Sequence, residues 1–427
     1  MKKKFVLAGA SLLTFGLLSL HQTEGIKLKK AFADQPFISG IEAHLQIRPR
    51  YEYVDVENSP NKDANALTVR TAITTKLKSL FGIKGFNGII EAANVGAIID
   101  DYSPQKPNYE LVPDPPITRF SQFAVTYTKN KTTFIGGRVY VTIDDHRFIG
   151  NVPWRQMYQS FGVLAVSTKA VKNFNLLLAG IYERKGIIDD LNADWRLDKM
   201  PLVLDINYSA HKSLRLKAFA YMITDVHDTF GLKASGKVKL GKVKLSYLGE
   251  YAKQDSPYAL DNLPANPNID ANYYRLSLGS VSGGFFGNIM YTHFDGRDTG
   301  EDKGFSTPLA TLHKFEGWSD VLLLGAANGF DYGLNEVGLT LGYKKPDLGN
   351  LMLIYLIFKS DMNPTDPTVG KDIGKELDVQ YTKKLTPHLS FLAKAAFYRA
   401  DDGYYTGGTL KGTQDVKKYW LQLNYLY

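Results

Sequence analysis

The chain has 427 residues, of which 44% are hydrophobic and 12% aromatic, so it can bury a large core and is not a disordered chain. It contains no cysteine, which excludes a disulfide framework, a thiolate metal site and a cysteine nucleophile. The formal net charge of the whole chain is +8, but the first 33 residues hold six lysines and one glutamate. Without them, 45 basic and 42 acidic residues remain, and the net charge is +3. No predicted element carries a block of Lys or Arg, so nucleic acid is not an expected partner.

The N-terminus has the features of a secretory signal peptide. Three lysines follow Met1, an apolar run extends from Phe5 to Leu20, and the sequence AFA at 31–33 is a small-residue cleavage site. We therefore predict a signal peptide over 1–33 and a single mature domain over 34–427. The alternative is an uncleaved anchor, although the apolar run is shorter than the roughly 20 residues that span a bilayer.

Beyond residue 33, hydrophobicity alternates with period two almost throughout, as in β-strands, and helical periodicity is nearly absent. Many of the alternating segments are about twice as long as the usual globular strand of ~5–6 residues, a length suited to crossing a membrane at a tilt. The predicted strands lie at 38–54, 64–79, 84–97, 118–129, 132–142, 158–171, 174–185, 200–210, 213–224, 228–239, 242–254, 270–281, 285–294, 331–344, 349–360, 372–384, 388–400 and 413–427.

The connections between these strands alternate between short and long. Tight turns such as 129–131, 211–212 and 282–284 alternate with polar stretches such as 99–117, 143–157 and 295–330. This arrangement predicts an all-β fold: an antiparallel transmembrane β-barrel of about 18 strands with short periplasmic turns and long extracellular loops. Such a barrel lies in the outer membrane of a Gram-negative bacterium, surrounded by lipid. A soluble β-sandwich is the alternative fold.

The last residue, Tyr427, is aromatic and ends an alternating strand. Bacterial outer-membrane barrels commonly end in this way, because the barrel-assembly machinery reads the last strand. That machinery is therefore an expected partner.

Charged residues occur in the middle of most predicted strands and share one parity, which places them on the lumen wall of a barrel. A solvated sheet face is the other explanation. Arginine forks bind carboxylates, so a ladder of them would pass anions from site to site; alternatively, arginine–acid pairs merely brace the barrel. The predicted pore-lining residues from this pattern are Arg48, Arg50, Arg70, Arg138, Arg215, Lys217, Arg275 and Lys394.

Two stretches of the chain are rich in uncommon residues. One contains GGR at 136–138, DDHRFIGNVPWRQ at 144–156 and QSF at 159–161; the other contains FSTPLATLHKFEGWSD at 305–320 and ANG at 327–329. Both stretches resemble the alginate-export family of outer-membrane proteins. The resemblance implies a monomeric barrel of about 18 strands that exports or admits anionic polysaccharide, or smaller solutes. It also implies that Arg138, Arg147 and Arg155 belong to the pore lining. Met157 and Gly162 depart from the family pattern, which has Asn-like and Asp-like residues there.

The predicted function is passive diffusion of anionic solutes or an alginate-like anionic saccharide through an arginine-rich lumen. A general small-solute porin is the first alternative, and an outer-membrane barrel enzyme is the second. None of the eight histidines lies in a G-x-S-x-G or H-E-x-x-H setting, so no catalytic residue, metal or cofactor is predicted. The acidic segment 295–302 offers ligands of the kind that Ca²⁺ prefers, but a solvated loop is the favoured interpretation.

Overall fold

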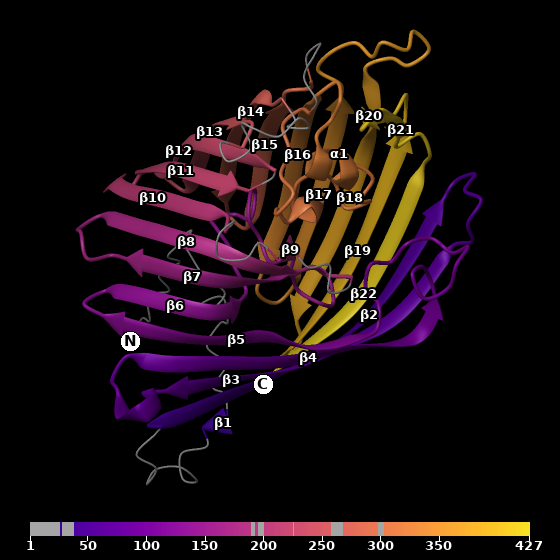
Figure 1. Cartoon of the computed structure of the whole chain (residues 1–427). Helices are drawn as coiled ribbons and strands as arrows, with labels where there is room; N and C mark the ends of the chain where they lie inside the picture. Colours follow the sequence, from indigo (N-terminus) through magenta and orange to yellow (C-terminus); the bar gives the residue numbers. More distant parts are fainter. Residues whose placement is uncertain are drawn as a thin grey trace.

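The computed structural model describes residues 26–27, 38–188, 193–194, 200–224, 226–257, 268–297 and 303–427. This part of the chain forms a closed antiparallel barrel of 18 long strands, which follow one another around the wall in sequence order (Figure 1). The barrel closes because its first long strand pairs with its last, with Arg50 opposite Gln422. The strands are β2 (Gly40–Val56), β3 (Ala64–Lys78), β4 (Phe86–Asp101), β5 (Ile117–Lys129), β6 (Thr132–Val139), β7 (Ser160–Thr168), β8 (Phe174–Lys185), β10 (Leu202–His211), β11 (Leu214–Ile223), β12 (His227–Leu240), β13 (Val243–Asp255), β14 (Asp270–Ser282), β15 (Phe285–Phe294), β16 (Leu334–Lys345), β17 (Gly349–Lys359), β18 (Asp372–Lys384), β19 (Leu389–Ala400) and β22 (Val416–Leu426).

The predicted barrel and the position of each predicted strand are therefore confirmed. Short elements complete the described part of the chain: β1 (Ile26–Lys27), β9 (Ala193–Asp194), the hairpin β20 (Tyr404–Thr406) and β21 (Thr409–Lys411), the 3₁₀ turns η1 (Leu80–Gly82) and η3 (Leu312–Lys314), and helix α1 (Leu323–Asn328). None of the helices in the described ranges is long and apolar enough to cross a membrane. Apart from Ile26 and Lys27, the predicted signal peptide lies outside the described residues and stays a prediction.

The two ends of the barrel differ in the length of their connections. One end of the barrel carries tight turns such as 130–131, 212–213, 241–242 and 283–284. The first residue of β2 and the last residue of β22 lie at the same end. The other end carries the long connections, with two exceptions: β2 and β3 are joined there by residues 57–63, and β12 begins at His227 soon after β11 ends at Ile223. Because tight turns mark the periplasmic end of this type of barrel, the long connections are extracellular.

The wall of the barrel is apolar outside and polar inside. In β3, Ile73 on the outer face is 54% exposed, whereas Arg70 on the inner face is 1% exposed. The same exposure of large apolar side chains recurs around the wall, for example at Phe123, Leu232 and Leu278. A soluble protein would bury these side chains, so the outward face is one that lies in lipid.

This topology can be tested by chemical labelling, because the chain has no cysteine of its own. Lys411 is exposed in β21 on the extracellular side, and Lys172 is exposed in the turn between β7 and β8 on the periplasmic side. In intact cells, an impermeant maleimide should react with the Lys411→Cys variant and not with Lys172→Cys. Lys172→Cys should react once the outer membrane is permeabilised. The opposite labelling pattern would mean that the barrel has the reverse orientation.

Candidate functional site: a lumen crossed by two inner loops

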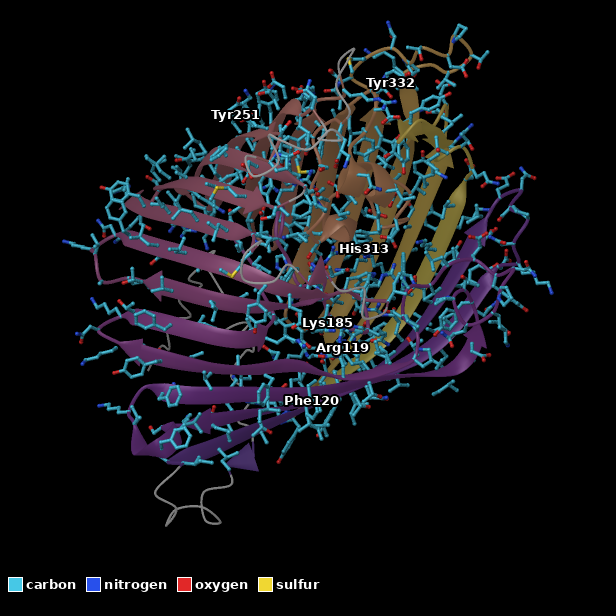
Figure 2. The ribbon with its side chains drawn as sticks, in the orientation of Figure 1. Arg119, Phe120, Lys185, Tyr251, His313 and Tyr332 are labelled. Atoms are coloured by element: carbon cyan, nitrogen blue, oxygen red, sulfur yellow. The ribbon has the colours of Figure 1, made fainter. Side chains whose placement is uncertain are left out.

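Two extracellular connections fold into the lumen instead of projecting outward. The first inner loop, residues 140–159, joins β6 to β7, and the second inner loop, residues 303–333, leads into β16. Both are largely buried, and their contacts reach strands on several sides of the barrel. Figure 2 shows His313 of the second inner loop inside the barrel. These two loops, together with the inner wall, form the candidate functional site.

Arg48 and Arg70, on the inner faces of β2 and β3, hold the end of the first inner loop. Arg48 donates hydrogen bonds to Gln156 Oε1 at 2.8 Å and to the Tyr158 hydroxyl at 3.1 Å. Arg70 donates to the Gln156 carbonyl at 3.0 Å and forms an ion pair with Glu91 at 2.8 Å. Both arginines are nearly fully buried by these contacts, so they bind the protein's own loop and are not open to lumen water.

Arg50, the next inward residue of β2, is held in a similar way. It donates to Gln422 Oε1 at 2.7 Å, lies 3.5 Å from Asp114, and stacks over the Trp154 ring with 4.1 Å to the centroid. Its exposed fraction is 1%. Trp154 belongs to the first inner loop, so this cation–π contact also fixes the loop to the wall.

The tip of the first inner loop crosses to the opposite wall. Asp144 lies 2.7 Å from the Lys233 ammonium and 3.6 Å from that of Lys217, while Asp145 lies 2.7 Å from the Arg275 guanidinium. Burial alone would raise the pKa of both aspartates, but the neighbouring cations outweigh it and hold each pKa below its usual range. Both tip carboxylates are therefore ionised at neutral pH.

The two inner loops meet at an ion pair between Arg155 and Asp320, 2.6 Å apart. Arg155 also contacts Glu52 of β2 at 3.1 Å, and Asp320 also contacts Lys418 of β22 at 3.0 Å. His313 lies 2.6 Å from Asp320. All of these side chains are almost completely buried, so the group ties both loops to the wall in one network.

Lys394 of β19, a predicted pore residue, lies among three tryptophan rings. Its ammonium lies 3.9, 3.6 and 5.2 Å from the ring centroids of Trp154, Trp318 and Trp420. Burial lowers the pKa of His313 well below its usual value, so the ring is neutral. Its Nδ1 then donates to Asp320, and its Nε2 accepts a hydrogen bond from Lys394 at 2.6 Å. The predicted lysine is thus enclosed by aromatic rings from both loops and the wall.

Arg147 joins the first inner loop to the second. It forms an ion pair with Glu316 and donates to the Tyr273 hydroxyl at 3.0 Å. Burial raises the pKa of Glu316 in spite of the adjacent guanidinium. Both partners are fully buried, so this pair has a packing function within the lumen.

Arg138 departs from the prediction of a pore-lining position. In the pairing of β5 with β6 it lies directly opposite Phe123, whose ring is 63% exposed on the outer face, and it forms an ion pair with Glu183 at 2.7 Å. Its side chain therefore lies on the outward side of the wall. Counted along the sequence, Arg138 shares its parity with Tyr140, which predicts an inward side chain. However, β6 ends at Val139, and parity has no meaning beyond the end of a strand.

Two cavities open on the periplasmic side of the inner loops. The first has a volume of about 440 Å³, and its lining includes Lys76, Lys78, Lys131 and Lys169 but no carboxylate among the described residues. The second has a volume of about 790 Å³. Its charged lining consists of Lys212, Arg215, Lys233, Lys237, Asp144 and Asp145. Arg215 is thus the predicted pore residue that lines an open cavity.

The predicted pore lining leaves out Asp320 and the lysines that line these two cavities, which we call the vestibule lysines. The alternation itself places Lys76 and Lys237 on the inward parity of Arg70 and Lys233. Asp320 lies in a loop, where no periodicity indicates its direction. Of the acidic segment 295–302, the structure describes only 295–297; Asp295 contacts His293 at 2.7 Å, and residues 298–302 lie outside the described ranges.

The network around Asp320 makes a prediction about stability. Asp320→Asn removes the charge that pairs with Arg155 and Lys418 and leaves Lys418 buried without an anion. We expect a loss of about 3–5 kcal/mol in the free energy of unfolding, measured by urea denaturation with tryptophan fluorescence. Lys359→Ala breaks an outward pair in which both side chains are more than half exposed, and it should change stability by about 0–1 kcal/mol. Equal effects of the two substitutions would contradict this account of the network.

Comparison with known proteins gives no match at the level of sequence: no protein-family model matches the chain, and neither does any curated protein. Solved structures do match. OccK8 (OprE) of Pseudomonas aeruginosa superimposes with a TM-score of 0.69 at 15% identity, covering 92% of this chain and 99% of its own. OccAB2 of Acinetobacter baumannii gives 0.69 at 13% identity, with the same coverage.

A third match is OpdK of Pseudomonas aeruginosa, solved with vanillate, with a TM-score of 0.68 at 11% identity over 92% of this chain and 99% of that one. These proteins are outer-membrane porins with 18-strand barrels. The likeness at this level of identity concerns the fold. The chain therefore has the fold of the porins that lie in the outer membrane of Gram-negative bacteria.

Proposed function

We propose that this protein is a passive-diffusion channel for anionic solutes, including carboxylated saccharides, in the outer membrane of a Gram-negative bacterium. The observation that carries the proposal is the charge of the periplasmic vestibule. The two cavities on that side are lined by eight Lys and Arg side chains and by two carboxylates, both of which belong to the tip of the first inner loop.

Apart from Lys233, the vestibule cations differ from the buried arginines in their exposure to water. Lys78, Lys131 and Lys169 are exposed, whereas Arg48, Arg50 and Arg70 are enclosed by the first inner loop. A solute that enters the lumen from the periplasm meets the exposed group first. The proposal therefore assigns the selection of anions mainly to the vestibule and the positioning of the loops mainly to the buried arginines.

The electrostatic basis of the proposal is the shape of the lumen. Low-dielectric walls focus the field of fixed charges, so a concave basic surface raises the local concentration of anions more than a flat one does. Conduction also requires that no single site binds too tightly. Lys78 is paired with Glu42, Lys76 lies on the same strand, and Lys131 and Lys169 lie in two different turns. This spacing gives multiple weak sites.

Carboxylates are the proposed class of anion. The chain's own carboxylates, Asp144 and Asp145, already lie against the basic inner wall. OpdK, which has a similar fold, was solved with vanillate, which is a carboxylate anion. The resemblance to the alginate-export family in the two inner loops extends the proposal to anionic polysaccharide.

Two other functions lead to different expectations. A general small-solute porin would pass anions and cations in similar proportion. A barrel enzyme would need an activated nucleophile; His313 has a carboxylate partner, but its other nitrogen faces Lys394 and not a serine. Neither alternative accounts for the concentration of cations in the vestibule.

Removing the lysines of the first cavity tests the proposal. The triple variant Lys76→Gln, Lys131→Gln and Lys169→Gln should lower the anion-to-cation permeability ratio, because it removes three charges from a concave surface. The ratio is measured from the reversal potential of single channels in a planar bilayer under a KCl gradient.

The matched control removes three lysines from the outward face: Lys253→Gln, Lys359→Gln and Lys417→Gln, each of which belongs to a surface ion pair. It should leave the reversal potential unchanged. If both triple variants behave like the unaltered channel, or if the unaltered channel shows no preference for anions, the proposed function is wrong and a general porin is the remaining interpretation.

A further inference from the structure

The tip of the first inner loop lies on a group of charges that belongs to the opposite wall. Strands β10 to β14 contribute three cations, Lys217, Lys233 and Arg275, and two carboxylates, Asp205 and Glu250. Lys217 contacts Asp205 at 2.7 Å, Arg275 contacts Glu250 at 2.8 Å, and Lys233 lies 3.6 Å from Glu250. This wall group by itself therefore has one cation more than it has carboxylates.

The tip reverses that balance. Asp144 and Asp145 contact all three wall cations, at 2.7 Å to Lys233 and Arg275 and 3.6 Å to Lys217. With the tip in place, the wall group and the two tip aspartates together have four carboxylates and three cations. Arrival of the tip thus changes the charge of the wall group from +1 to −1, while Lys212, Arg215 and Lys237 keep the rest of the cavity basic.

The tip carboxylates lie between the wall cations and the open cavity. The side chains of Asp144 and Asp145 are 18% and 28% exposed, whereas those of Lys217, Lys233 and Arg275 are 3–6% exposed. Asp144, Asp145 and Lys233 all line the 790 Å³ cavity. A solute carboxylate in that cavity is therefore adjacent to the positions that the tip occupies.

We propose that Asp144 and Asp145 act as a built-in competitor: they occupy a carboxylate-binding site formed by Lys217, Lys233 and Arg275, and a carboxylate of the permeating solute displaces them. The inference rests on the proposed function and identifies one site of that channel, its ligand chemistry and the segment that blocks it. Arg275 and Lys217 are thus ligands for solute only after the tip has moved.

The exchange conserves the interactions of the wall. At each cation that the solute carboxylate reaches, one charge-assisted contact replaces another, and the displaced aspartates regain contact with the water of the cavity. Asp144 and His146 of the tip have left-handed backbone conformations, with φ of 54° and 73°. The wall contacts hold the tip in this conformation.

The first test is block by D-glucuronate, a soluble carboxylate probe, in single-channel recordings. In the double variant Asp144→Asn, Asp145→Asn the wall cations lose their internal competitor. We expect the anion-to-cation ratio to rise and the half-blocking concentration of glucuronate to fall by about tenfold, the equivalent of about one charge-assisted hydrogen bond. The control double variant Asp366→Asn, Asp372→Asn removes one half-buried and one exposed carboxylate from the extracellular loop and rim and should behave like the unaltered channel.

The second test holds the tip in place. Asp144→Cys and Lys233→Cys put two thiols at positions whose native side chains are 2.7 Å apart, in a chain with no other cysteine. A short bis-methanethiosulfonate cross-linker should raise the half-blocking concentration, and reduction should restore it in the same channel. Each channel is its own control, so a folding defect in the aspartate variant does not decide the outcome.

The outcomes separate this inference from the proposed function. If the unaltered channel prefers anions and the vestibule lysines determine that preference, but neither the aspartate variant nor the cross-link changes block by glucuronate, the competitor is refuted and the proposed function stands. If the unaltered channel has no anion preference, the function and the inference both fall.

Discussion

The ion pair between Arg155 and Asp320 joins two loops in the middle of a membrane barrel, and the arrangement of the lumen depends on pairs of this kind. Taking a single charge out of water costs several kcal/mol unless a partner of opposite sign is in place. The inner wall carries many charges because the outer wall must be apolar to contact lipid. Any segment that fills the lumen must therefore bring matching charges, and both inner loops do so.

This constraint divides the basic residues of the lumen into two groups. Arg48, Arg70 and Arg147 face carboxylates, carbonyls or hydroxyls of the protein itself and have lost their water. The vestibule lysines face open cavities. The same chemistry, a cation that binds oxygen acceptors, positions loops in the first group and is available to solutes in the second. Desolvation decides which of these two functions a residue has.

The tip of the first inner loop lies at the boundary between the groups. Its aspartates meet buried wall cations on one side and cavity water on the other. The side chains of Asp144 and Asp145 meet the wall through charge-assisted contacts, which a ligand carboxylate can replace. The rest of the loop is held by ring packing as well, at Phe148 against Phe219 and at Trp154 against His313. The two aspartate side chains are thus the exchangeable part of a firmly packed lumen.

The sequence by itself determined the strands, the closure into a barrel of about 18 strands and the inward direction of Arg48, Arg70, Arg215 and Arg275. It could do so because a strand has a strict period of two, and a shift of one residue would turn an apolar face into the lumen. The same rule failed at Arg138, where the comparison with Tyr140 extended past the end of β6.

Only the tertiary structure decided which lumen charges are open to water. Arg48 meets Gln156, and Arg155 meets Asp320, across separations of more than 100 residues, and the loops that supply these partners have no periodicity to indicate their direction. Alternation predicts which face of the wall a side chain occupies, but not which residues pack over that face. The burial of a lumen side chain depends on the long-range pairing of charges, which exists only once the barrel has closed around the loops.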